Sequence, residues 1–316
     1  MRTVAVKKNR LPDSPKSSLI KRFRKSAFLI VLFFPALIYY ILFKYVPMWG
    51  VSIAFYKYSI YKGFAGSKFV GLQHFKVFFN SPDWWQYTKN TFALGIQSCL
   101  ISFPLTILFA LLLNEVRGVR FKKITQTVSY LPHFLSTVVV VSLMQSLCDP
   151  TTGAINQIIS ALGGSPIYFF TEGKWFRPLY EISAVWQGLG WGTIIYLAAI
   201  SAVDPGLYEA ARLDGAGRWR QMWSITLPSI LPTVSTMFIM KIGNIMGDSM
   251  EKVLLMQHPV TYQYSQTIST YTYNVGMTQN KFDYSTAINL FSNMINLVFL
   301  FGANWISKKL TDNSIF

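Results

Sequence analysis

Side chains that could carry out catalysis are few in this sequence, and their spacing forms no recognisable reaction centre. The chain holds thirteen Asp and Glu, three His and two Cys. It contains no G-x-x-x-x-G-K-[ST] phosphate-binding loop, no HExxH zinc motif and no nucleophile elbow. Cys99 and Cys148 lie in apolar runs without a partner pattern and are interpreted as packing thiols. We therefore expect no catalytic residue, no metal and no cofactor in this chain.

Two polar residues inside an apolar stretch have spacing that suits ligand binding. Lys241 and Asn244 lie about one helical turn apart in the stretch 229–247. A charged side chain at membrane depth should face water, a partner or a ligand. The loop that follows is rich in tyrosine, so an amine beside it would suit an acidic oligosaccharide. The alternatives are that Lys241 extends to the membrane surface or pairs with Asp248.

A stripe of polar residues near the C-terminus could also contribute to ligand binding. Asn289, Ser292, Asn293 and Asn296 recur at spacings that share one helical face. Lipid cannot satisfy these side chains, so the stripe should face a cavity or another subunit. We assign Asn289 and Asn293, with Lys241 and Asn244, to a substrate pathway; hydrogen bonding between helices is the alternative. His133, beside Pro132, is another intramembrane candidate, and a packing role is the alternative there too.

A charged island, Asp204–Pro232, separates two long apolar segments. Asp204 is a good N-cap and Pro205 suits the first helical position. Gly215 suits the end of this short helix, because glycine adopts a left-handed C′ conformation without strain. A second short helix is predicted to carry Trp219, Met222 and Trp223 on one side, before Pro228 and Pro232 open the next apolar run.

This island resembles the EAA loop of membrane subunits of ABC importers. The signature positions are filled by Glu209, Ala210 and Ala211, by Asp214, Gly215 and Ala216, and by Ile225, Leu227, Pro228 and Pro232. Met222 stands where the family commonly has Phe. The resemblance implies that these residues form a coupling helix, which enters a cleft of a cytoplasmic ATPase. An ordinary amphipathic loop between two spans is the alternative.

The elements that must position these residues are membrane spans. Hydrophobic residues make up 52% of the chain and charged residues only 13%, with a mean hydropathy of +0.33. Crossing a hydrocarbon core of ~30 Å takes about 20 apolar residues. Six stretches meet this length, at residues 26–46, 91–113, 124–148, 182–203, 229–247 and 286–306. We predict an all-α integral membrane protein with six transmembrane helices.

The positive charges predict an orientation for these spans. Eighteen of the 29 Lys and Arg lie in segments 1–25, 114–123, 204–228 and 307–316. The positive-inside rule therefore places both termini in the cytoplasm, as expected for a multi-pass protein of a bacterial cell membrane. Residues 1–25 are predicted to be a basic, disordered tail; a signal peptide and a nucleic-acid arm are the rejected alternatives.

The segment organisation follows from these spans. Residues 26–90 are predicted to hold the first transmembrane helix and an external loop, and residues 91–306 a five-helix permease core with the EAA loop at 204–232. Residues 307–316 are predicted to be a cytoplasmic tail. The external segment, with FVGLQHF at residues 69–75, resembles the importer subgroup that moves complex oligosaccharides.

The resemblance implies a type I ABC importer permease fold and alternating access. It also implies a second, similar permease subunit, two cytoplasmic ATPase subunits that bind ATP and Mg, an external solute-binding protein and an oligosaccharide substrate. No nucleic-acid partner is expected, and lipid surrounds the spans. A secondary transporter or an integral-membrane enzyme are the rival classes. Neither the clustered acids that an enzyme would need nor the inverted repeats common in secondary transporters are found.

Overall fold

The protein is described by a computed structural model over residues 27–311. The prediction for the tail 1–25 lies outside these residues, as does the second half of the tail 307–316, whereas residues 307–311 belong to the last helix. The chain divides into two compact units, residues 1–52 and 53–316, and each is described by itself.

The described part of the first unit is an apolar helical segment. α2 (Ala27–Tyr40) continues through a π-helical turn (Ile41–Tyr45) into α3 (Val46–Met48) and a 3₁₀ turn (Trp49–Phe55). No residue of α2 or α3 is buried. A helix with apolar side chains on every face is stable in lipid, so this segment has the properties of a membrane span.

The second unit begins with a small antiparallel sheet, which the sequence analysis did not predict. β1 (Tyr56–Ser59) pairs with β2 (Gly63–Phe69), and Tyr56 lies opposite Phe69. The rings of these two residues are 5.2 Å apart, a cross-strand aromatic pair of the kind that stabilises hairpins. α4 (Gln73–Phe79) follows the hairpin.

The second span consists of two helices joined almost without interruption. α5 (Trp84–Leu100) and α6 (Ser102–Glu115) together form an apolar segment of 32 residues. The irregular residue is Ile101, three positions before Pro104. Proline in an inner helical position would clash with the carbonyl of residue i−4, here Leu100, so the helix restarts at this point.

The third predicted span, 124–148, is broken rather than kinked. α7 (Val119–Tyr130) runs into a 3₁₀ turn (Leu131–Phe134), and α8 (Thr137–Leu147) leaves at an angle of 101°. Pro132 accounts for the end of α7, because proline removes a helical hydrogen bond. The predicted span 124–148 is therefore a pair of helices with a sharp turn between them.

The fourth span starts earlier than predicted. α9 (Ala154–Ala161) lies within the predicted loop, and α10 (Gly173–Ser201) is a helix of 29 residues that begins before the predicted boundary at residue 182. Its early turns already bury one face, at helical spacing, through Phe176, Leu179, Tyr180 and Ser183. Pro178 falls in the second turn and does not end the helix.

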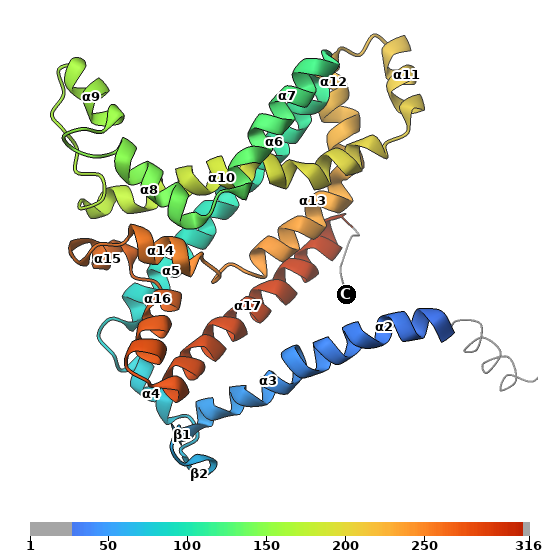
Figure 1. The fold of residues 1–316 in the computed structure, drawn as a ribbon. Helices are drawn as coiled ribbons and strands as arrows, with labels where there is room; N and C mark the ends of the chain where they lie inside the picture. Colours follow the sequence, from blue (N-terminus) through green and yellow to red (C-terminus); the bar gives the residue numbers. More distant parts are fainter. Residues whose placement is uncertain (1–26, 312–316) are drawn as a thin grey trace, which may run out of the picture. The chain divides into compact units, whose positions relative to one another are not determined.

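The charged island forms the turn between the fourth and fifth spans. α11 (Pro205–Leu213) is bent by 72° from α10. α12 (Arg218–Gln221), a π-helical turn (Met222–Thr226) and α13 (Leu227–Ile242) then form one helical segment of 25 residues. Figure 1 shows α11 and the β1–β2 hairpin at opposite ends of the second unit.

The tyrosine-rich region is helical rather than a loop. It contains α14 (Met250–Met256), α15 (Tyr262–Ser265) and α16 (Ile268–Tyr273). α17 (Phe282–Thr311) follows as the last span and packs against α13, α16 and α4.

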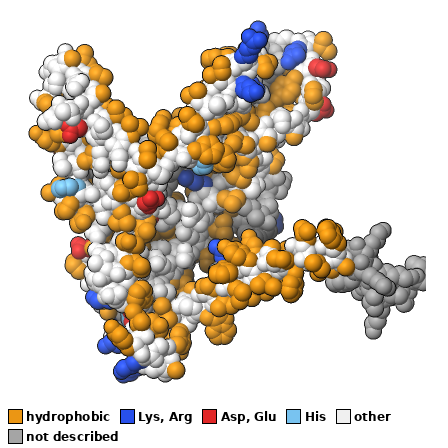
Figure 2. All heavy atoms as spheres, viewed as in Figure 1, with side chains coloured by type: hydrophobic (Ala, Val, Ile, Leu, Met, Phe, Trp, Pro, Cys, Tyr) orange, Lys and Arg blue, Asp and Glu red, His pale blue; other side chains and the backbone are white. Residues whose placement is uncertain are grey.

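Helix α10 lies at the centre of the packing, in contact with α6, α7 and α13. One apolar cluster, made by Leu111, Ile200, Met222 and Ile230, joins α6, α10 and α13 beneath the charged island. Many large apolar side chains remain exposed elsewhere. Figure 2 shows hydrophobic side chains over the middle of the second unit, with Lys and Arg gathered at its two ends. This distribution suits a lipid environment.

The span count agrees with six transmembrane segments. Within the described residues, four helices are long and apolar enough to cross a membrane, and two bent helix pairs raise the number to six. The bent pairs are the third span and the junction of α10 with α11.

The close crossing of α7 and α10 at Gly190 gives a test of this packing. A methyl group on Gly190 would lie 2.1 Å from the carbonyl oxygen of Ser129, whereas one on Gly188 would meet no atom within 4 Å. We expect Gly190→Ala to lower the free energy of unfolding by about 2 kcal/mol, because two backbones must separate. Thermal unfolding in detergent micelles measures this. Gly188→Ala is the matched control, and equal stability of the two variants would contradict the crossing.

Candidate functional site

The helix α11 begins as its sequence predicts. The Asp204 side chain accepts a hydrogen bond from the backbone N–H of Gly206 at 2.9 Å, and Pro205 occupies the first helical position. The cap satisfies one of the free N–H groups of the first turn, and proline has no N–H to satisfy. The N-terminus of α11 is thus fixed by two adjacent residues.

The C-terminus of α11 is closed by a Schellman motif. The N–H of Ala216 donates to the carbonyl of Ala211 at 2.8 Å, and the N–H of Gly215 donates to that of Arg212 at 3.0 Å. Gly215 has a φ of 76°, in the left-handed region. The sequence prediction for Gly215 is confirmed, because this motif requires a residue that tolerates positive φ at C′.

α11 projects from the bundle with no buried residue. Leu213 is 91% exposed and Leu207 is 49% exposed. Glu209, Ala210 and Asp214 are exposed, while Ala211 and Ala216 are half-buried. A short helix in this state buries too little apolar surface to stabilise itself, so its conformation depends on its caps and on the contacts at its base.

Polar contacts hold the base of α11 to the neighbouring spans. They are an ion pair of 2.8 Å between Arg218 and Glu115, a hydrogen bond of 2.7 Å from Gln221 to the carbonyl of Ala216, and a hydroxyl contact of 2.9 Å between Tyr208 and Thr226. They surround a cavity of about 690 Å³ between the ends of α6 and α11. Tyr208 thereby ties α11 to the π-helical turn before α13, whereas the ion pair joins α12 to α6.

The second short helix of the island, α12, is continuous with the fifth span. It continues into α13 through the π-helical turn, which ends two residues before Pro228. A widened turn accommodates the missing N–H and the bulk of the proline ring. Met222 is 1% exposed, whereas Trp219 and Trp223 are 65% and 54% exposed. The three residues therefore differ in burial, and Met222 packs into the cluster beneath the island.

A second site lies between the spans. A cavity of about 740 Å³ is lined by side chains of α6, α10 and α13, among them Ser102, Thr106, Trp191, Tyr196, Lys241 and Asn244. The structure thus brings Lys241 and Asn244 to one cavity. Lys241 Nζ donates to Ser98 Oγ at 2.7 Å. Within the described residues, Lys241 forms no ion pair with Asp248 or with any other carboxylate.

An aromatic group borders the same cavity. The Trp191 ring lies in the lining, and His133 stacks on it with ring centroids 4.5 Å apart and planes at 6°. Phe134 meets Trp191 edge-on at 5.7 Å. His133 and Phe134 come from the break between α7 and α8, so the broken span orients the ring of Trp191. His133 therefore has a packing contact.

Glu181 was missed by the sequence analysis. It is 2% exposed, and its Oε1 accepts a hydrogen bond from Ser102 Oγ at 2.6 Å. Lys252, 5% exposed, donates to Gln187 at 3.2 Å and lies 5.7 Å from the ring of Tyr180. The predicted span boundary at 182 left Glu181 outside the membrane. The helical spacing of Phe176, Leu179, Tyr180 and Ser183 is the signal that could have placed it.

The polar stripe of α17 divides between two environments. Ser292 is buried, and Asn296 accepts a hydrogen bond from the backbone N–H of Met246 at 2.9 Å. Asn289 and Asn293 are exposed, and they are not in the lining of the cavity that contains Lys241. Part of the stripe therefore bonds between helices, and the assignment of Asn289 and Asn293 to a substrate pathway stays a prediction.

Comparisons with known proteins agree with this architecture. The profile of the family described as "Binding-protein-dependent transport system inner membrane component" matches residues 102–312. The polygalacturonan/rhamnogalacturonan transport system permease protein YteP of Bacillus subtilis (strain 168) is 45% identical over 304 residues, covering 96% of this chain and 94% of the relative. Protein LplB of the same organism is 42% identical over 293 residues, covering 93% and 92%.

Solved structures give the same result. A chain of a bacterial alginate ABC transporter, in complex with an alginate pentasaccharide-bound periplasmic protein, superposes with a TM-score of 0.84 at 37% identity, covering 93% of this chain and 99% of that chain. A chain of a bacterial ABC transporter involved in the import of the acidic polysaccharide alginate gives a TM-score of 0.83 at the same identity and coverage. The chain therefore belongs to the family of binding-protein-dependent transport system inner membrane components, and it is a membrane-embedded permease subunit of an ABC importer.

Proposed function

We propose that this permease subunit forms part of the route by which an acidic oligosaccharide enters the cell. The observation that carries the proposal is Lys241, which lines the cavity between α6, α10 and α13 and has no carboxylate partner within the described residues. Desolvating a cation without a counter-charge is unfavourable, so a substrate carboxylate is a suitable partner. The transport of acidic polysaccharides by the relatives supports this reading.

The other lining groups suit a sugar. Trp191 offers a flat ring held by His133, and Asn244 offers an amide that can donate and accept hydrogen bonds. Carbohydrates present apolar ring faces and peripheral hydroxyls, so a ring and an amide are complementary to them. Lys241 then adds selectivity for a carboxylate over a neutral hydroxyl.

The energy is proposed to come from partners. In this proposal α11, with Glu209, Ala210, Ala211, Asp214, Gly215 and Ala216, docks on one of two cytoplasmic ATPase subunits, which bind ATP and Mg. A second, similar permease subunit completes the pathway, and an external solute-binding protein delivers the substrate. The exposed leucines of α11 support the first contact, and the periplasmic protein in the alginate transporter complex supports the last.

The geometry suggests how docking would move the cavity. α11 lies between α10 and the segment that leads into α13, and both of these helices line the cavity. The caps at both ends of α11 and the contacts at its base resist bending. A displacement of α11 by a closing ATPase dimer is therefore transmitted to two cavity walls, as alternating access requires.

An orientation with both termini in the cytoplasm is part of the proposal. Eighteen of the 29 Lys and Arg fall in the segments assigned to the inside. The β1–β2 hairpin lies at the end of the second unit opposite α11 (Figure 1), so it would face outward when α11 faces the ATPase.

Removal of the cavity cation tests the substrate. We expect Lys241→Met to lower uptake of a galacturonate trisaccharide by about tenfold, which corresponds to about 1.4 kcal/mol, and to leave uptake of a neutral trisaccharide nearly unchanged. Uptake by cells that express the assembled importer measures this, with Lys241→Arg as the charge-retaining control. An equal loss for both sugars, or no loss, would remove the substrate assignment.

The Schellman motif offers a test of coupling. Gly215→Val places a β-branched residue at a φ of 76°, whereas Gly217 has a φ of −67° and an equally open environment. We expect Gly215→Val to insert normally but to lose most uptake and co-purification of the ATPase, because strain of about 1–3 kcal/mol unwinds the end of α11. Gly217→Val is the matched control, and normal uptake in both variants would contradict the coupling role.

The energy supply has its own test. We expect the purified chain without partners to show no specific, Mg-dependent ATP hydrolysis, because its sequence has no phosphate-binding loop. A phosphate-release assay measures this, and activity that persists after removal of contaminating ATPases would contradict the proposal.

A further inference from the structure

The β1–β2 hairpin carries an unusual concentration of positive charge. Residues 44–82 contain five lysines and no Asp or Glu. Four of these lysines belong to the second unit and are exposed, namely Lys57, Lys62, Lys68 and Lys76. Figure 2 shows Lys and Arg side chains gathered at the hairpin end of the unit. None of the four forms an ion pair within the described residues.

Two of these lysines face each other across the sheet. Lys57 on β1 lies directly opposite Lys68 on β2, so their side chains leave the same face of the hairpin. Like charges in directly opposed positions destabilise an antiparallel pair. A two-stranded hairpin is marginally stable on its own, so such repulsion is a real disadvantage unless an anion is bound between the two amines.

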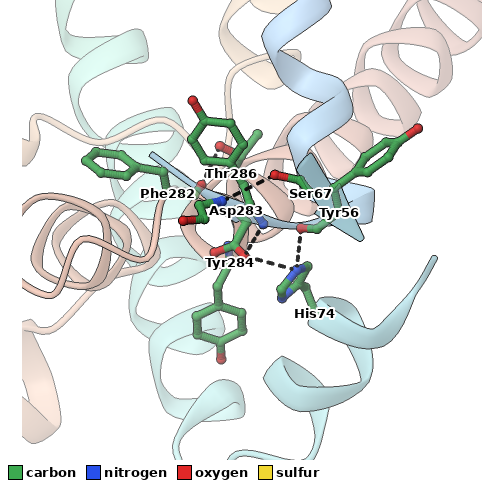
Figure 3. A network of polar contacts seen from close by, with 9 residues as sticks. Tyr56, Ser67, His74, Phe282, Asp283, Tyr284 and Thr286 are labelled. Carbon is green, nitrogen blue, oxygen red and sulfur yellow. Dashed lines mark hydrogen bonds and ion pairs between the residues drawn. The ribbon is translucent and has the colours of Figure 1, made fainter. Parts of the chain in front are cut away.

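The hairpin is anchored firmly enough to present these lysines. Asp283, at the start of α17, accepts a hydrogen bond from the backbone N–H of Tyr58 at 3.0 Å and lies 3.5 Å from His74 Nε2. His74 Nε2 also lies 3.0 Å from the carbonyl oxygen of Tyr56 (Figure 3). The carboxylate of Asp283 is thus engaged by the backbone and by His74, and it is not available to the lysines.

Aromatic rings accompany the charge. Tyr61 at the tip is 100% exposed, and Phe69 and Phe64 are 64% and 45% exposed. Phe64 and Phe69 pack around Tyr56, with centroids 4.9 and 5.2 Å from its ring. Tyr56 and Phe69 are the strand neighbours of Lys57 and Lys68, so this aromatic group lies on the opposite face of the sheet. The exposed ring of Tyr61 at the tip remains available to a ligand that the paired amines bind.

We propose that the face of the hairpin that carries Lys57 and Lys68 is a surface site for the carboxylates of an acidic oligosaccharide. The site is separate from the cavity that contains Lys241. Its orientation toward the outside rests on the proposed function. The two amines engage carboxylates of neighbouring sugar residues and relieve their mutual repulsion, while Tyr61 at the tip supplies a stacking plane. The exposed ring of Tyr61 favours a sugar chain over a lipid phosphate, which needs only the charge.

Binding of a defined probe tests the site. The full chain, in nanodiscs of uncharged phosphatidylcholine, is titrated with a fluorescent galacturonate trisaccharide and with a neutral trisaccharide. The Lys241→Met background removes any contribution of the cavity. We expect Lys57→Gln/Lys68→Gln to weaken binding of the acidic probe about fivefold or more, with a smaller effect at high salt. Lys308→Gln/Lys309→Gln, at the other end of α17, is the matched control and should bind as the parent does.

A direct readout does not depend on these variants. Carbodiimide coupling of the bound probe, followed by peptide mass analysis, should label Lys57 or Lys68 in preference to the other lysines.

The Lys68→Glu variant should lose binding of the acidic probe. It should nevertheless slow amide hydrogen exchange in the hairpin, because it converts the repulsive pair of residues 57 and 68 into an attractive one.

Three results would overturn the inference. They are undiminished binding of the acidic probe in the Lys57→Gln/Lys68→Gln variant, equal weakening by the control pair, and displacement of the probe from the hairpin when the nanodiscs contain phosphatidylglycerol. The last would assign the lysines to lipid headgroups. The two proposals can fail separately. If Lys241→Met loses selectivity for the acidic sugar in uptake but no probe binds at the hairpin, only the hairpin site is removed and the proposed function stands.

Discussion

Every break in a helix inside a bilayer frees backbone groups that lipid cannot satisfy, and this constraint determines much of the interior of the protein. Side-chain amides supply the missing partners. Gln187 donates to the carbonyl of Leu135 at 3.0 Å, at the break of the third span. Asn296 accepts from the N–H of Met246 at 2.9 Å, beyond the end of α13. Asn90, fully buried, donates to two carbonyls of the segment that contains α15. At each of these three places, a side chain from a neighbouring helix bonds backbone groups that the helices themselves leave free.

The breaks in turn create the surfaces on which function depends. The break between α7 and α8 brings His133 against Trp191 in the cavity lining. The bend between α10 and α11 sends a short helix out of the bundle, and the helices on either side of that turn line the same cavity. Irregular backbone is tolerated where it is buried in protein or faces a cavity, and these breaks meet that condition.

Local chemistry predicted the local structure well and the long-range structure less well. Asp204, Pro205 and Gly215 fixed both ends of α11, because a cap and a Schellman motif depend on a few adjacent residues. The start of α10 was placed about nine residues late, since polar residues and Pro178 hid a helix whose buried face is set by tertiary contacts. The hairpin was missed because its strands are short and mostly exposed. Periodicity alone could not tell which residues of the α17 polar stripe bond to a neighbouring segment and which are exposed. The partner of Asn296 is a backbone group some 50 residues away in the sequence.

The distribution of buried charge separates structural from functional groups. Glu181 and Lys252 are both almost fully buried, but each is bonded, to Ser102 and to Gln187, and their opposite charges lie in the same region of the bundle. These two hydrogen bonds link α6 to α10 and α10 to α14. Lys241 differs, because it is only half-buried and its amine borders a cavity, where it donates to the hydroxyl of Ser98. A single hydroxyl orients the amine without neutralising it. The amine is therefore exposed to the cavity contents, which is the basis for proposing an anionic substrate.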